Sequence, residues 1–414
     1  MGSPRAGRGR AMAIAGAWMA LSGLPGELDA QLLVQPYESP PTVWATEILP
    51  PHLLSSDAHH VDDEVDTDGN FFRFTVHSEY GTYEPASLAL FEVRIHEIVT
   101  LRQAITQYER GERTFAGSPE GQVRLGEPLT QSDLAAANRV LTAPLMAPGE
   151  RGGRGQPASP SPRGDPVFEA HKRNVAALYR LDVYSSNPTV QSFLDTVASA
   201  RIEGRFSAGA GSFILAPPDH QRRIEGGVLE AKLGSRIRSN SREDLALWLE
   251  GELARMGADT QLRRRFIGHP HLSPRHQSAL VVYLGYLDKV ARRDLLIRAA
   301  LDARDERDAL SYEQLARMLA LYHAEIEKLD RLETRGSGLP VAVTISRALV
   351  VALPVDIIHW SEEAAAVFRA LDEHAQRPAF SRREVVLSGM LTDMAKRQLG
   401  ALVFDYRERF LLRR

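Results

Sequence analysis

The feature that most constrains the fold is a pair of helix starts between residues 165 and 206. Asp165-Pro166 opens the first expected helix, because Asp caps free backbone N–H groups and Pro is tolerated in the first turn. Asn187-Pro188 repeats this signal. Each start is followed by a partly apolar stripe at helical spacing, Val167, Ala170, Asn174, Ala177, Leu178 and Leu181 in the first and Val190, Phe193, Leu194 and Val197 in the second. Two consecutive helices joined by a polar corner are therefore predicted.

We call this corner, DVYSSNP at residues 182–188, the elbow. One interpretation is a small polar site, because backbone N–H groups at a helix N-terminus favour an anion. The other is a capped corner, because Ser, Asn and Asp are common corner residues. We favour structural roles for Asp182, Tyr184 and Asn187. The Asn187 oxygen should accept from a backbone N–H two or three residues on, and the Tyr184 ring should pack on one of the two helices.

Residues 61–145 predict a β-hairpin followed by helices. Asp68-Gly69 is a hairpin signal, and Gly81 indicates a second turn, so two or three antiparallel strands are expected. A helix should then cover Ser87 to Glu109, with another after Thr130. The apolar face of the first is Leu88, Phe91, Ile95, Ile98, Leu101, Ile105 and Tyr108, and its other faces carry Glu92, Arg94, Glu97 and Arg102.

Residues 166–330 predict a helical domain, with further starts at Ser241, Ser273-Pro274 and Ser311. From residue 331 to 414 the pattern changes to a small α/β domain. Its expected elements are a half-buried strand at Val341, Val343 and Ile345, a central strand at 349–353, a helix at 361–375, a strand at 384–387, a helix at 392–399 and a strand at 402–406. The fold class is therefore α+β, mostly helical.

The remaining segments indicate export. Residues 1–30 combine three arginines, an apolar run at 11–24 and a small-residue cleavage pattern before Gln31, which is typical of a signal peptide. Residues 31–60 are Pro-rich and extended, and residues 146–165 read as a disordered linker. The chain has no cysteine, no later apolar run of spanning length and a net charge of −3. We expect a periplasmic or secreted protein without a membrane span, and nothing favours nucleic acid as a partner.

Three groups of residues have some features of a metal site. His59, His60 and the acidic residues from Asp62 to Asp68 resemble part of a calcium loop, but the loop's final Glu is missing. His96-Glu97 begins like a zinc-protease helix, but position 100 is Thr. Whether His269, His271 and His276 converge stays open, since no carboxylate partner follows from their spacing.

Ser388-Gly389, with Asp356 and His359 earlier in the chain, permits a hydrolase arrangement without a supporting motif. Caps at strand ends are the simpler interpretation. No motif in the chain is complete, so no catalytic, cofactor-binding or metal residue and no cofactor is assigned.

Several segments resemble a family of uncharacterised exported bacterial proteins, with DVYSSNP and LSPRHQ, residues 272–277, as its markers. The resemblance covers most of the chain after about Asp62 and implies export and a shared fold. It brings no activity, cofactor or catalytic residue. Around residues 200–216 the family is more apolar and glycine-rich, and Arg201, Glu203 and Arg205 depart from that pattern.

The leading functional hypothesis is an exported, non-enzymatic binding or assembly protein whose partner is a protein or an envelope component. The alternative is an exported hydrolase with an unrecognised site, and one version of it is metal-dependent around the three histidines.

Overall fold

The structure is a computed structural model that describes residues 37–116, 165–202, 233–234, 236–237, 240–334, 339–376 and 380–411. The expected signal peptide, the helix after Thr130 and residues 146–164 of the expected linker lie outside these ranges. Among the described helices, none is long and apolar enough to cross a membrane. The described part confirms an α+β fold dominated by helices.

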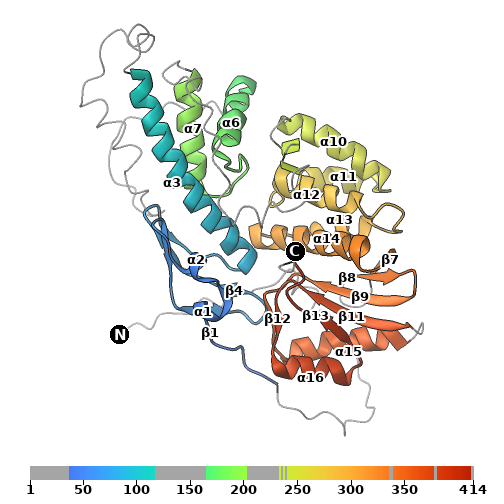
Figure 1. Cartoon of the computed structure of the whole chain (residues 1–414). Coiled ribbons are helices and arrows are strands. Elements are labelled where there is room, and N and C mark those ends of the chain that lie inside the picture. Colours follow the sequence, from blue (N-terminus) through green and yellow to red (C-terminus); the bar gives the residue numbers. More distant parts are fainter. Residues whose placement is uncertain are drawn as a thin grey trace, which may run out of the picture.

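Short antiparallel strands begin the described chain (Figure 1). One sheet has the order β1-β3-β4 and the other β2-β5-β6. Their elements are β1 (Val43–Trp44), α1 (Ala45–Ile48), α2 (Pro51–Leu54), β2 (His59–Val61), β3 (Glu64–Thr67), β4 (Phe72–Arg73), β5 (Val76–Ser78) and β6 (Gly81–Tyr83). The Asp68-Gly69 turn joins β3 to β4 as predicted, and Phe72, Phe74 and Val76 are buried. The segment holds more strands than the two or three expected.

In the described residues the next helices are α3 (Leu88–Ala116), α6 (Pro166–Tyr179) and α7 (Pro188–Ile202), and they pack together on one side of the molecule (Figure 1). The apolar faces of α3 and α7 are those predicted. The predicted face of α6 is wrong by one position: Val167 is exposed, and Phe168, Val175 and Tyr179 are buried instead. The aromatic rings decide the face, since Tyr179 packs edge-on against Phe193 at 5.3 Å between ring centroids.

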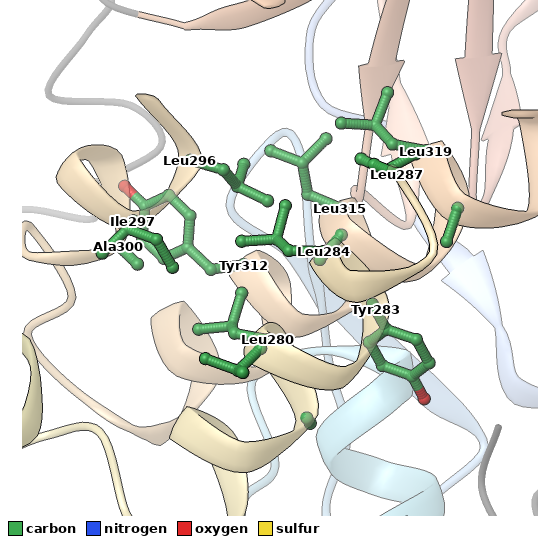
Figure 2. Close-up of a cluster of buried hydrophobic side chains, with 14 of the residues drawn as sticks. Leu280, Tyr283, Leu284, Leu287, Leu296, Ile297, Ala300, Tyr312, Leu315 and Leu319 are labelled. Atoms are coloured by element: carbon green, nitrogen blue, oxygen red, sulfur yellow. The ribbon is translucent and has the colours of Figure 1, made fainter. Parts of the chain in front are cut away.

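A second group of helices forms the main core. Its members are α10 (Arg242–Arg255), α11 (Thr260–Ile267), α12 (Pro274–Gly285), α13 (Asp294–Ala300) and α14 (Glu306–Glu325). Figure 2 shows leucine side chains of α12 and α14 meeting those of α13 in this core. The predicted starts at Ser241 and Ser273 are confirmed. The predicted start at Ser311 is wrong, because Asp305 caps α14 and Ser311 lies inside it, its hydroxyl donating to the carbonyl of Arg307.

A five-stranded sheet of order β13-β11-β9-β8-β7 completes the fold. Its elements, with the short strands beside it, are β7 (Leu329–Thr334), β8 (Pro340–Thr344), β9 (Ala348–Leu353), β10 (Ile357–Ile358), α15 (Glu362–Gln376), β11 (Arg382–Leu387), β12 (Met390–Leu391), α16 (Asp393–Ala401) and β13 (Asp405–Arg407). Strands β9, β11 and β13 are parallel, and β8 pairs antiparallel with both β9 and β7.

Both faces of this sheet are covered, which corrects the prediction of a half-buried strand. Ala342 and Val350 belong to the core shared with α10–α14, whereas Val341 and Leu349 belong to a core with α15 and α16. Figure 1 shows α14 and α15–α16 on opposite sides of the sheet. Ile345, predicted to face the core, is exposed because β8 ends at Thr344. Strand β7 was not predicted, and it spans the expected domain boundary between residues 330 and 331. The last strand begins at Asp405 rather than Leu402, because residues 402–404 turn after α16.

Candidate functional site

The elbow is bound to α3 and α14 through a polar network that is buried at Glu97 and Ser185 and exposed at Ser186. Arg94 of α3 donates to Glu97 on the same helix at 2.7 Å, to the Ser186 hydroxyl at 2.7 Å and to Glu306 at the start of α14. Ser185 donates its hydroxyl proton to the other oxygen of Glu97. Ion pairs and hydrogen bonds thus connect three segments that are far apart in sequence.

Asn187 has the capping role predicted for it. Its side-chain oxygen accepts from the backbone N–H of Thr189 at 3.0 Å, which starts α7. Its amide nitrogen donates to Glu97 at 3.2 Å, and only 1% of the residue is exposed. The same side chain therefore caps a helix and satisfies a buried carboxylate.

Glu97 is the buried centre of this network, although the sequence placed it on a polar face of α3. It is 3% exposed. Burial raises its pKa against the opposing effect of Arg94, Ser185 and Asn187. The Arg94 pair does not distinguish this Glu from a solvated one, and its other two partners, Ser185 and Asn187, come from the elbow.

A cavity of about 560 Å³ lies beside the elbow, between α3, α6, α12 and α14. We call it the elbow cavity. This volume is in the range of small-molecule sites. Its charged lining residues are four arginines and four carboxylates: Arg173, Arg180, Arg275 and Arg317, and Glu97, Asp182, Glu306 and Glu313.

Arg275, at the start of α12, faces this cavity. Its Nε lies 3.5 Å from Asp182 of the elbow, and 35% of its side chain is exposed. Within the described residues, neither terminal nitrogen of its guanidinium makes a hydrogen bond. Burial favours the neutral form, but the charges of Asp182 and Glu313 outweigh it and raise the pKa of Arg275. Arg275 therefore presents a fixed positive charge to the cavity.

Tyr184 and Asp182 line the same cavity. The Tyr184 ring packs against the core of α10–α14, not against α6 or α7 as predicted. Asp182 accepts from the backbone N–H of Tyr184 at 2.9 Å, so it shapes the elbow as well as pairing with Arg275. The two interpretations of the elbow are therefore not exclusive, because its capped corner also forms a wall of the cavity.

The three histidines of residues 269–276 all line a further cavity of about 1050 Å³, but their side chains make different contacts. His269 contacts the carbonyl of Leu301 at 3.1 Å through Nε2 and accepts from the backbone of His271 through Nδ1, so both its ring nitrogens are engaged. His276 instead pairs with Glu313 of α14 at 3.0 Å and reaches the elbow cavity. In the described ranges no group of three or more His, Cys, Asp or Glu side chains is arranged to hold a metal.

The acidic hairpin residues are part of the fold. Asp68 accepts from the backbone of Phe71 at 2.9 Å and pairs with Arg307 at 3.0 Å, which attaches the hairpin to α14. His59 contacts the Ser56 hydroxyl at 2.8 Å and the Leu53 carbonyl at 3.1 Å. These contacts leave neither residue directed at a common metal position.

The groups of the hydrolase arrangement near the sheet each bind backbone instead of one another. Ser388 donates to the carbonyl of Val355 at 2.8 Å, and His359 contacts that of Gly69 at 2.8 Å. Asp356 accepts from the N–H groups of Phe72 and Leu88. Gly389 is required for packing, since a Cβ there would lie 1.9 Å from the Asp356 carbonyl oxygen. The contacts are those of strand-end anchors.

Comparison of the chain with protein-family models, with curated proteins and with solved structures gave no match.

Sequence reasoning missed Arg275 and Glu313 as lining residues of one cavity. Arg275 and His276 lie in LSPRHQ, the segment that marks the resemblance to a family. That segment was the feature of the sequence that could have pointed to these two residues. No feature of the sequence pointed to Glu313, because it lies 37 residues from His276 in the middle of a helix.

Proposed function

We propose that this chain is an exported binding protein that holds a small molecule in the elbow cavity, through a carboxylate or phosphate group. The observation that carries the proposal is the Arg275 guanidinium, open to a cavity of about 560 Å³. A guanidinium binds either group through two parallel N–H donors. The proposal replaces the protein or envelope partner favoured by the sequence with a small molecule.

The charges around the cavity favour an anion at this position. Glu97 and Glu306 share Arg94, and Glu313 pairs with His276. Asp182 is the acidic partner of Arg275, and it also accepts a backbone hydrogen bond. The acidic groups therefore already have donors within the protein, whereas the two terminal nitrogens of Arg275, a lining residue of the cavity, make no hydrogen bond within the described residues. A ligand anion would accept hydrogen bonds from these nitrogens. Such charge-assisted bonds are strong where the site is partly shielded from water.

The test is a thermal unfolding screen with two series of probes, dicarboxylates of three to six carbons and phosphorylated sugars. A ligand that binds only the folded state at 100 times its Kd adds about 2.7 kcal/mol to stability. We expect one series to raise Tm in the parent and Arg275→Gln to abolish that shift. Arg298→Gln is the matched control, since Arg298 is 49% exposed and lies outside the cavity lining. An unchanged shift in Arg275→Gln, or no shift with either series, rejects the proposal.

Export is tested by intact mass. The apolar run and cleavage pattern predict a mature N-terminus near Gln31 in protein recovered from its native host. Recovery of the chain from the cytoplasm with residues 1–30 attached contradicts export.

The second candidate remains a hydrolase, and one observation favours a version that needs no metal. His276 and Glu313 form a buried pair in the same cavity that holds Arg275.

A further inference from the structure

The His276–Glu313 pair has the geometry of an oriented general base. His276 lies in the first turn of α12 and is 6% exposed, and Glu313 of α14 is 9% exposed. The contact joins His276 Nδ1 to Glu313 Oε2 at 3.0 Å. A buried carboxylate behind one ring nitrogen fixes the orientation of the imidazole and directs the other nitrogen elsewhere.

The ionisation of Glu313 follows from its surroundings. Burial favours the neutral acid, but the His276 hydrogen bond and the charges of Arg275 and Arg317 outweigh it and lower the pKa of Glu313. An ionised carboxylate only accepts hydrogen bonds, so we assign the shared proton to His276 Nδ1. A neutral imidazole with Nδ1 protonated carries its lone pair on Nε2.

Nε2 of His276 is available to a molecule in the cavity. Within the described residues this nitrogen makes no hydrogen bond. It is not fully buried either, because it is absent from the unpaired polar atoms that are. His276 itself lines the elbow cavity, next in sequence to Arg275. A base and an anion-binding group therefore face the same space from one helix turn.

We propose that the elbow cavity hydrolyses an ester whose acyl part carries an anionic group, with Arg275 holding that group and His276 activating water. The inference rests on the proposed binding function and adds a reaction to it. In the step, His276 Nε2 takes one proton from water as the water oxygen bonds to the acyl carbon. The bond from that carbon to the ester oxygen then breaks, and the imidazolium returns the proton to the departing alkoxide. The products are a carboxylic acid, which ionises, and an alcohol.

Water is the nucleophile because the two serine hydroxyls of the elbow already have other hydrogen-bond partners. Ser185 donates to Glu97 and accepts from the backbone N–H of Asn187 at 3.0 Å. Ser186 donates to Glu306 at 2.6 Å. Neither hydroxyl pairs with His276 in the described residues, so neither of these two serines is activated as in a hydrolase triad.

The experiment uses the full chain and two esters of equal acyl length. These are the mono-4-nitrophenyl ester of glutaric acid, which keeps a free carboxylate, and neutral 4-nitrophenyl pentanoate. We expect the parent to prefer the anionic ester in kcat/KM by at least about 10-fold and His276→Gln to lower kcat on it by about 100-fold, a typical general-base contribution. Arg275→Gln should raise KM and remove the preference between the esters.

Glu313→Gln keeps the size of the side chain and removes the charge that stabilises the imidazolium. It should lower kcat at unchanged KM, which distinguishes positioning of the base from a loss of folding. In His276→Ala, added imidazole should restore part of the rate, which a purely structural histidine would not allow.

Binding of glutarate, measured by calorimetry, separates the two proposals. Glutarate binding without ester turnover, or equal turnover in the parent and a folded His276→Gln, overturns hydrolysis and leaves binding intact. Absence of both glutarate binding and turnover rejects hydrolysis, and binding is rejected as well if the phosphorylated sugars give no Tm shift. If circular dichroism shows that the His276 variants do not fold, two other results test hydrolysis. These are the preference of the parent for the anionic ester and the kcat of Glu313→Gln.

Discussion

The two polar atoms of the Asn187 side chain make one local and one long-range contact. The oxygen caps α7 within two residues, which is a local interaction. The nitrogen reaches Glu97, 90 residues earlier in the chain. Replacing this residue therefore tests both contributions at once.

Asn187→Ala should lower the free energy of unfolding by roughly 2–4 kcal/mol, about 1 for the cap and the rest for the bond to a charged group. Asn187→Ser is the control, because a serine oxygen still caps α7 but does not supply the nitrogen that reaches Glu97. Urea unfolding should place Ser between the parent and Ala. Equal values for Ser and Ala would show that the cap contributes nothing.

At the scale of elements, α3 is buried on two faces by different means. Its apolar face packs on the N-terminal strands and α7, as its helical period predicts. Beside that apolar face lies Arg94, which is 11% exposed and pairs with two carboxylates. Removing one partner from a buried ionic network leaves charges unpaired in a poorly solvated place.

Arg94→Met should therefore cost about 3–5 kcal/mol of stability. Arg298→Met is the matched comparison, since Arg298 also pairs with two carboxylates, Asp259 and Asp294, but is 49% exposed. Exposed pairs contribute at most about 1 kcal/mol. Urea unfolding of both variants at one pH measures the difference. A similar loss in both would mean that the buried network adds nothing beyond a surface pair.

Across the whole molecule, Asp356 joins three distant parts. Its carboxylate accepts from Phe72 of β4 at 2.9 Å and from Leu88 at the start of α3 at 2.8 Å, while its own segment follows β9. Burial raises its pKa to about 7 despite those two hydrogen bonds, and Asp68 and Glu92 add to the rise.

A carboxyl group with a raised pKa in the folded state binds its proton more tightly there than in the unfolded chain. Its contribution to stability is full below the unfolded pKa of 3.8 and is lost as pH rises through about 7. Asp356→Asn keeps an oxygen acceptor and removes this titration. The variant should gain stability relative to the parent between pH 5 and pH 8, measured by denaturant unfolding at both values. A constant difference would contradict the raised pKa.

Glu92 is expected to act in the same direction, because burial raises its pKa to about 7 as well. It is present in both proteins, but its charge contributes to the raised pKa of Asp356, so the difference between the parent and Asp356→Asn includes the coupling of the two groups.

The sequence by itself determined those features that depend on neighbours within a few residues. Asp165, Asn187, Ser241 and Ser273 cap helices where expected, because a cap joins a side chain to backbone two or three positions away. The apolar face of α3 followed from its period, and the hairpin at Asp68-Gly69 followed from its turn residues. All of these are decided by local backbone geometry.

Only the tertiary structure decided which polar groups are buried and which of them meet. Val341 is buried because helices cover both faces of its sheet, and Glu97 is buried because the elbow folds over it. His276 meets Glu313 because α12 packs along α14. Each outcome depends on segments tens or hundreds of residues apart, and residue spacing within one segment carries no information about which other segment will cover it.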